Sequence, residues 1–271
     1  MSLNRFKDRI LVCDMDGTLL DSKQKVSPTN LDAIRRFVQG GGFFTLATGR
    51  DEKAIAPFME LLPVNLPVII YNGAALYDFK KDKILWCSWL PDSVRETVQE
   101  LMIRFPELGV MVFKRSSIYF LKENYYTDAL IQRDSVEPHY ASIDEIPLPW
   151  TKVILAWDPE CHKKQMENHL DSLKLPFRHV YSQPDFIEFL NNEATKGTAL
   201  SQLSKLTGIP KSHIVSMGDN MNDLEMIQYA GAGIAVSNAH EDLKKCADLC
   251  CCHHEENAVA QVIDWMETGK I

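Results

Sequence analysis

The chain has 271 residues, a formal net charge of −8 and a hydrophobic content of 45%. That length predicts one large or two modest domains, and the composition is typical of a packed core. The acidic balance and the lack of a cluster rich in Lys and Arg disfavour nucleic acid as a partner. No apolar run approaches the roughly 18 residues of a membrane span, and residues 1–9 are too polar for a signal peptide. The seven cysteines lack a disulfide-like spacing, which favours the reducing cytoplasm.

The first part of the chain alternates predicted strands and helices. The apolar run Ile10–Cys13 predicts a buried strand. Ser27 and Pro28 are typical of the N-cap and first turn of a helix, which the glycines at 40–42 end. The pattern then predicts a strand over 43–47, a helix over 54–62 and a strand over 67–71. This order favours a parallel sheet with helices on both faces.

The pattern changes near Asp82 to aromatic strands and irregular turns rich in proline. The runs Val110–Phe113 and Ile118–Leu121 flank a short polar segment and predict a hairpin. Further on, the sequence predicts a strand over 151–157 and a helix over 160–173. These elements indicate a separate α+β domain inserted into the first one.

Alternation returns after Lys196. It predicts helices over 197–206, 224–229 and 257–267, and strands over 214–217 and 233–236. We therefore predict an α/β fold with a Rossmann-like, doubly wound parallel sheet as its core. Residues 1–83 and 191–271 are expected to form this discontinuous core, and residues 84–190 the inserted α+β cap domain.

Two acids follow the first predicted strand. Asp14 and Asp16 are two residues apart, so strand geometry would point both side chains the same way. At about 4 Å and an effective dielectric of about 20, two such carboxylates repel by about 4 kcal/mol. A hard divalent cation would relieve this repulsion.

Four polar segments fall at the carboxyl ends of predicted parallel strands or at the start of a helix, the edge where such sheets bind ligands. Each alone has a simpler interpretation, because acids often cap helices, a lone lysine is usually solvated and a Gly-Asp pair is usually a turn. Together they supply the groups that phosphoryl transfer needs. The segments are Asp14–Thr18, Thr48-Gly49-Arg50, Lys196 and Gly218–Asp223.

The chemistry of phosphoryl transfer suggests a role for each acid. Asp14 can attack phosphorus and form an aspartyl-phosphate. Mg²⁺ must shield the two anions, and its predicted ligands are Asp14, Asp219 and, through its backbone carbonyl, Asp16. Asp16 can also protonate the leaving oxygen and later activate water. Asp223 could hold a metal-bound water or orient Lys196.

The phosphoryl oxygens need hydrogen-bond donors. The predicted donors are the Thr48 hydroxyl, the Gly49 amide, the Lys196 ammonium and the Asn222 side-chain amide. We expect Arg50 to form a structural ion pair, whereas Arg115 is equally compatible with a structural and a substrate-binding role.

These four segments resemble the motifs of the haloacid dehalogenase superfamily of phosphatases. Tyr71–Ala74 and Ala235–Ala239 also resemble the Cof-type branch, which carries a large α/β cap between the second and third motifs. The resemblance covers essentially the whole chain and implies the roles given above. It further implies that Asn222 contacts phosphate and that Asp223 is an acid supporting the metal ligands.

Two other signals are weaker. Cys250–His254 combines cysteines and histidines, but the contiguous spacing disfavours a zinc site and indicates a strand end followed by a loop. Gly231–Ala235 resembles half of a dinucleotide-binding motif, yet it precedes a strand rather than following one. Neither a nucleotide-binding P-loop nor a serine-hydrolase nucleophile motif is present.

The sequence thus predicts a cytoplasmic, Mg²⁺-dependent phosphatase that hydrolyses a small phosphorylated metabolite, such as a sugar phosphate, through an aspartyl-phosphate. Neither a nucleic acid nor a membrane is an expected partner. One alternative is a phosphotransferase or phosphomutase with the same nucleophile, and another is a non-catalytic module that binds a metabolite.

Overall fold

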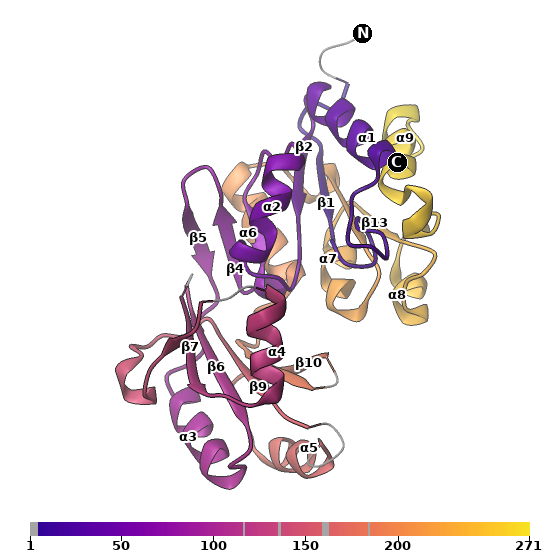
Figure 1. Cartoon of the computed structure of the whole chain (residues 1–271). Coiled ribbons are helices and arrows are strands. Elements are labelled where there is room, and N and C mark those ends of the chain that lie inside the picture. The colour runs from indigo at the N-terminus through magenta and orange to yellow at the C-terminus, as the bar shows by residue number, and fades with distance from the viewer. Residues whose placement is uncertain (1–4, 116, 135–136, 159–162, 184) are drawn as a thin grey trace. The chain divides into compact units, whose positions relative to one another are not determined.

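The computed structural model describes residues 5–115, 117–134, 137–158, 163–183 and 185–271 (Figure 1). The chain divides into two compact units. Met1–Trp86 and Ala194–Ile271 form the first unit, and Cys87–Glu193 form the second. The chain thus leaves the first unit after Trp86 and returns to it at Ala194, a few residues beyond the boundaries expected from the sequence. Among the described residues, no helix is both long and apolar enough to cross a lipid bilayer.

The first unit contains a five-stranded parallel sheet in the order β14-β13-β12-β1-β2. Strand β1 pairs in parallel with β12 on one side and with β2 on the other. The α/β class and the parallel core that the sequence predicts are therefore confirmed. The strands are β1 (Ile10–Cys13), β2 (Phe43–Leu46), β12 (Ile214–Gly218), β13 (Ala232–Ala235) and β14 (Leu249–Cys250).

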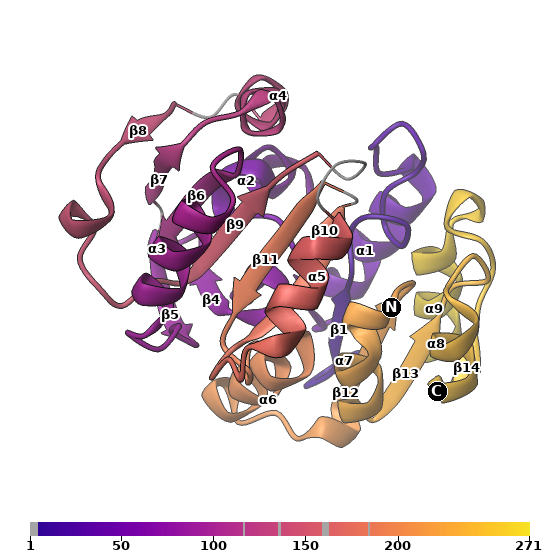
Figure 2. The same cartoon turned by 90° about the horizontal axis from the view of Figure 1, so that it is seen from below.

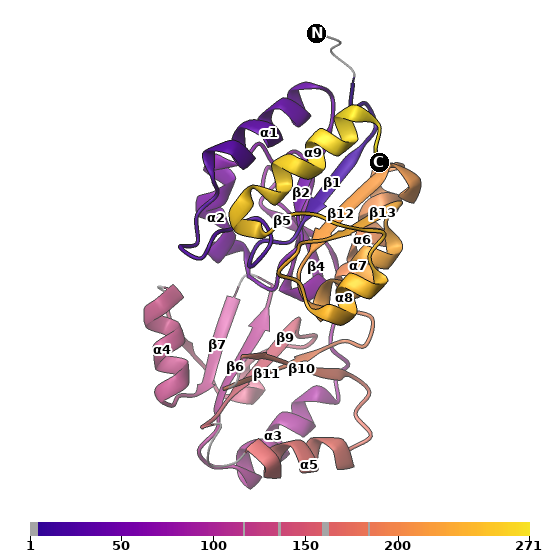
Figure 3. The ribbon, with the colours of Figure 1, turned by 90° about the vertical axis from the view of Figure 1, so that its right-hand side faces the viewer.

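Helices cover both faces of this sheet. Side chains of Ile10 and Val12 pack with α6 (Lys196–Thr207) and α7 (Leu224–Tyr229). Alternation along β1 directs Leu11 and Cys13 to the opposite face. There α1 and α9 lie side by side (Figure 3). The remaining helix bounds in this unit are α1 (Pro28–Gln39), α2 (Glu52–Leu61), α8 (Glu241–Cys246) and α9 (Ala258–Thr268).

Local sequence signals explain where α1 begins and ends. The Ser27 hydroxyl accepts the backbone N–H of Asn30 at 3.1 Å, and Pro28 occupies the first turn. Gly40 ends the helix, with its N–H donating to the carbonyl of Arg36 at 3.0 Å. The predicted cap and stop of this helix are thus confirmed.

The sequence predicts that the strand over 67–71 belongs to the parallel sheet, and the structure corrects this expectation. β3 (Val68–Ile70) joins the parallel sheet through the bridge between Ala47 and Ile69. Its main partner is β4 (Ala75–Asp78), which runs antiparallel to it, and β5 (Lys83–Cys87) follows in a separate three-stranded sheet. The reason is the tight turn Tyr71–Gly73, a 3-10 helix that reverses the chain.

The second unit is built on a six-stranded sheet in the order β10-β11-β9-β6-β7-β8. The predicted hairpin is confirmed, because β6 and β7 pair antiparallel around Lys114 and Ser117. The helices α3 and α5 lie across one face of the sheet and share a hydrophobic core with it (Figure 2).

The bounds of its strands are β6 (Gly109–Lys114), β7 (Ser117–Lys122), β8 (His139–Tyr140), β9 (Lys152–Ala156), β10 (Arg178–Gln183) and β11 (Phe186–Leu190). Those of its helices are α3 (Val94–Arg104), α4 (Tyr125–Asp134) and α5 (Lys163–Ser172). The predicted start of the last helix, residue 160, lies outside the described residues.

Candidate active site

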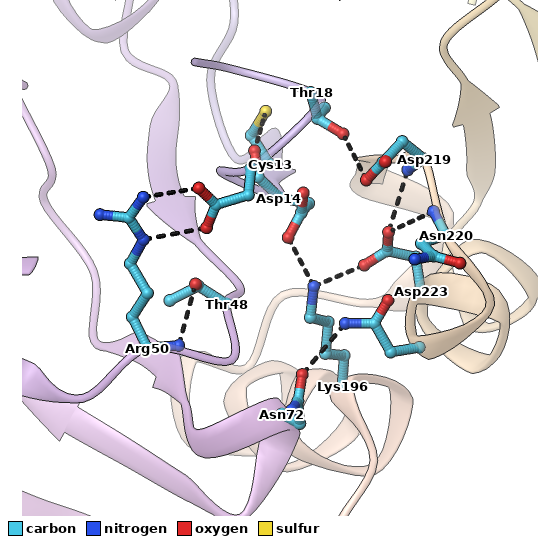
Figure 4. A network of polar contacts seen from close by, with 12 residues as sticks. Cys13, Asp14, Thr18, Thr48, Arg50, Asn72, Lys196, Asp219, Asn220 and Asp223 are labelled. Carbon is cyan, nitrogen blue, oxygen red and sulfur yellow. Dashed lines mark hydrogen bonds and ion pairs between the residues drawn. The ribbon is translucent and has the colours of Figure 1, made fainter. Parts of the chain in front are cut away.

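Asp14 is the first residue beyond the carboxyl end of β1. Its backbone N–H donates to the carbonyl of Met217 at 3.0 Å, so the β1–β12 pairing fixes its position. The side chain is buried, and its Oδ1 accepts a hydrogen bond from Nζ of Lys196 at 2.6 Å (Figure 4). The other oxygen, Oδ2, is buried without a hydrogen-bond partner among the described residues. Asp14 thus presents one anchored and one unsatisfied carboxylate oxygen.

Lys196 is fully buried at the start of α6. Thr195 caps this helix, since its hydroxyl accepts the N–H of Thr198 at 3.0 Å. The Lys196 ammonium donates to Asp14 and to Oδ1 of Asp223, each at 2.6 Å. Burial disfavours its charge, but the two adjacent carboxylates outweigh burial and raise its pKa. Lys196 therefore stays protonated and neutralises part of the buried negative charge.

Asp219 and Asp223 come from the turn after β12. Asp223 is fully buried, and its Oδ2 accepts the backbone N–H groups of Asp219 and Asn220 at 2.9 and 3.1 Å. Asp219 lies against Gly17, where φ is +80° and a Cβ would stand 2.5 Å from the Asp219 carboxylate. Only glycine fits this approach of the two loops.

The donor set at this point suits a divalent cation. Oxygens of Asp14, Asp219 and Asp223 all lie within 4.8 Å of one another. Asp223 already accepts three hydrogen bonds, which leaves Asp14 and Asp219 as the side chains able to bind a metal directly. Three carboxylates against one ammonium leave two negative charges uncompensated, which a single divalent ion balances.

The pKa values of the two acids reflect this excess charge. Burial raises the pKa of Asp14 well above its ordinary value, although Lys196 opposes the shift. Burial and the neighbouring Asp223 raise the pKa of Asp219 to about 6. A bound cation would favour the ionised form of both carboxylates.

Asp16 differs from Asp14 in its surroundings. Its side chain is half exposed, and both its oxygens bind the guanidinium of Arg50. The two acids have different partners, and the strand alternation from which a shared direction is expected does not extend to Asp16, because β1 ends at Cys13. The ion pair expected for Arg50 does form, and it involves the acid predicted to transfer the proton.

The predicted phosphate donors surround the same edge of the sheet. The Thr48 hydroxyl is buried and accepts the N–H of Arg50 at 3.1 Å, which leaves its own hydrogen able to donate. Nδ2 of Asn222 donates to Oδ1 of Asn72 at 3.0 Å. The sequence indicated no role for Asn72 beyond its place in Tyr71–Ala74, the segment that resembles the Cof-type branch.

Asn238 and His254 hold the loop that follows Asp14. Nδ2 of Asn238 donates to the carbonyl of Gly17 at 2.8 Å and its Oδ1 accepts the N–H of His254 at 3.1 Å. Nδ1 of His254 contacts the carbonyl of Leu20 at 2.8 Å. In the described part of the chain, the potential metal cluster consists of aspartates alone. The Cys250–His254 segment thus supports the loop as part of the protein scaffold.

The chain matches a known hydrolase family in sequence and in fold. The family model for haloacid dehalogenase-like hydrolases matches residues 11–263, and the chain belongs to this family. The prediction of an enzyme of the haloacid dehalogenase superfamily, in its Cof-type branch, is confirmed.

Relatives with curated names cover nearly the same length. Pyridoxal phosphate phosphatase YbhA of Escherichia coli is 24% identical over 94% of this chain and 97% of its own. The 5-amino-6-(5-phospho-D-ribitylamino)uracil phosphatase YitU of Bacillus subtilis is 23% identical over 95% and 97%. Among solved structures, a haloacid dehalogenase-like hydrolase from Bacteroides thetaiotaomicron has a TM-score of 0.84 and 27% identity, covering 94% of this chain and 98% of that one.

Proposed function

We propose that the protein is a Mg²⁺-dependent phosphatase that hydrolyses a small phosphorylated metabolite through an aspartyl-phosphate on Asp14. The observation that carries the proposal is the state of the Asp14 carboxylate. Lys196 anchors one oxygen, while the other is buried and unsatisfied at the sheet edge where ligands bind. A buried, oriented carboxylate of this kind is a suitable nucleophile.

The reaction takes two steps. Oδ2 of Asp14 attacks phosphorus, the P–O bond to the leaving alcohol breaks, and Asp16 gives its proton to the departing oxygen. Asp16, now a carboxylate, then takes a proton from water as that water attacks phosphorus. The bond to Asp14 breaks, inorganic phosphate leaves and the enzyme returns to its starting state.

The remaining residues bind and orient the phosphoryl group. Thr48, Gly49 and Asn222 donate hydrogen bonds to its oxygens, and Lys196 neutralises part of the charge on Asp14. Asp223 orients Lys196 through its own hydrogen bond of 2.6 Å. Mg²⁺ held by Asp14, Asp219 and the Asp16 carbonyl would supply the positive charge that lets two anions approach.

The relatives' names support a small phosphomonoester as substrate, since they specify pyridoxal phosphate and a phosphoribitylamino uracil. We propose that the inserted unit acts as the cap domain and sets which phosphomonoester is accepted. A cytoplasmic location remains the prediction from cysteine usage.

The test is a phosphate-release screen over phosphorylated metabolites, with Mg²⁺ and with EDTA, on the wild type and on Asp14→Asn. We expect Mg²⁺-dependent release that the substitution abolishes. Near-normal release by Asp14→Asn would contradict the nucleophile. An isomerised substrate with little free phosphate would instead identify a mutase, and binding without turnover under any metal would identify a binding module.

A further inference from the structure

The Tyr71–Gly73 turn connects segments that the proposed function uses. The N–H of Tyr71 donates to the carbonyl of Arg50 at 3.1 Å, and the N–H of Asn72 donates to that of Thr48 at 3.0 Å. Gly73 has φ of +92°, and a Cβ there would stand 2.1 Å from the Thr195 carbonyl. The turn is thus fixed against the Thr48–Arg50 segment and against the residue that caps the Lys196 helix.

The backbone of this turn is strained. Tyr71 and Asn72 both have φ of +54°, in the left-handed region that asparagine tolerates but that a bulky residue such as Tyr71 rarely adopts. Such strain persists only where the surroundings impose it, and it concentrates at functional sites. Here the buried Tyr71 hydroxyl donates to Oε2 of Glu52 at 2.6 Å, which anchors the turn to the first turn of α2.

The result of this anchoring is the position of the Asn72 side chain. Its Oδ1 accepts Nδ2 of Asn222 at 3.0 Å. Asn222 itself is exposed in a short turn, Met221–Asp223, so without this acceptor its amide is free to rotate. Asn72 also stands against Gly49, where a Cβ would lie 3.0 Å from the same Oδ1. The Asn72 amide therefore lies beside two predicted phosphate donors, Asn222 and Gly49.

We infer that Asn72 is a positioning residue for phosphate binding, which orients the Asn222 amide toward a phosphomonoester and keeps it beside Gly49. This inference rests on the proposed function, because Asn222 needs orientation only if it binds phosphate. Binding of the phosphate group in the ground state should suffer more than the chemical step, so KM should rise and kcat should change little. Inhibition by inorganic phosphate should weaken by the same factor.

The test uses Asn72→Gly, which removes the amide and tolerates the left-handed backbone. We expect KM and the inhibition constant of phosphate to rise about tenfold, as for loss of one hydrogen bond to a charged group. The matched control is Asp8→Gly, which also replaces a left-handed residue (φ 58°) and lies before β1, at the end opposite to Asp14. It should leave both constants unchanged.

A double-mutant cycle with Asn222→Ala tests whether Asn72 acts through Asn222. We expect Asn72→Gly to have little further effect in the Asn222→Ala background. Independent effects that multiply, or unchanged constants in Asn72→Gly, would overturn the inference. The rise in Tm caused by inorganic phosphate with Mg²⁺ gives a second readout without turnover. A wild type that binds phosphate but releases none would defeat the proposed function while still testing Asn72.

Discussion

Arg50 binds both carboxylate oxygens of Asp16, with Nε 2.9 Å from Oδ2 and one terminal nitrogen 2.5 Å from Oδ1. This fork geometry fixes the plane of the carboxylate as well as its position. The guanidinium also bonds the Gln24 side chain and lies 5.5 Å from the centre of the Phe58 ring. The acid proposed to carry the proton is thus oriented by the arginine that follows Thr48 and Gly49.

Replacing Arg50 should therefore impair proton transfer. We expect Arg50→Met to lower kcat about tenfold to a hundredfold on an alkyl phosphate, a part of the roughly 10²–10⁴-fold that general acids contribute. The loss should be much smaller on p-nitrophenyl phosphate, whose leaving group needs no proton. Steady-state kinetics on the two substrates measures this difference.

The control for that experiment is Arg35→Met, because Arg35 forms an ordinary surface pair with Asp32 on α1. It should leave both rates unchanged. Equal losses on the two substrates in Arg50→Met would show that Arg50 acts on something other than the proton transfer.

Lys196 holds the charge balance of the buried acids. In Lys196→Met, Asp14 and Asp223 lose their shared counter-charge, and we expect the free energy of unfolding at neutral pH to fall by about 3–5 kcal/mol. The deficit should shrink as the pH falls, because the pKa of Asp14 is raised and protonation removes the repulsion. Urea unfolding at pH 7.5 and pH 5 measures it.

A triple variant provides the contrast. Adding Asp14→Asn and Asp223→Asn to Lys196→Met removes the charges together, so most of the lost stability should return. If Lys196→Met is as stable as the wild type at pH 7.5, Lys196 does not balance the charges of Asp14 and Asp223.

Asp219 should make metal binding depend on pH. Its pKa of about 6 lies above the ordinary 3.8, so its ionised form opposes folding above about pH 6, and this penalty disappears below pH 3.8. Mg²⁺ binds the ionised form. We therefore expect Mg²⁺ to raise Tm clearly at pH 7.5 and hardly at pH 5, as measured by thermal unfolding with and without the metal.

Asp219→Asn removes this charge and should therefore stabilise the metal-free protein at pH 7.5. A gain on the order of 1 kcal/mol would raise Tm by about 2–4 °C. The Mg²⁺-induced shift should vanish in this variant. A full Mg²⁺ response in Asp219→Asn would remove Asp219 from the metal ligands.

A second buried ion pair lies in the inserted unit. Nζ of Lys152 is 3.4 Å from Oε2 of Glu188 and 4.6 Å from the centre of the Phe113 ring, and both charged side chains are buried. Lys152→Met alone leaves Glu188 buried without this charge partner, and we expect a loss of about 3–5 kcal/mol. The double variant Lys152→Met, Glu188→Met should recover most of it in urea unfolding.

Recovery in the double variant identifies the loss as electrostatic. If both variants lose the same stability, the loss comes from packing around Phe113 rather than from the unpaired charge.

The sequence predicted most of the parallel core because its signals are local. Apolar runs, the Ser27 cap and the acids at strand ends indicate both the elements and the edge where ligands bind. Asp14, Lys196, Asp219 and Asp223 do come together at that edge.

The features that the sequence did not predict depend on tertiary contacts. Asp14 and Asp16 have different partners, which strand alternation could not predict because β1 ends at Cys13 and strand ends are poorly defined by propensity. The Asn72-Gly73 pair is typical of a turn, but nothing local predicts the left-handed backbone of Tyr71 before it. The partner of Asn222 is likewise 150 positions away.

The interrupted first unit has a consequence for synthesis on the ribosome. Lys196 follows Asp14 by 182 positions, and the entire second unit is made between them. Until Lys196 emerges, the Asp14 carboxylate lacks its counter-charge, and until residues 214–218 emerge, β1 lacks its neighbour β12. One side of β1 therefore stays unpaired during this interval, and it forms an open sheet edge of the kind that chaperones protect. Metal affinity should consequently arise late in synthesis, when the turn carrying Asp219 folds onto β1.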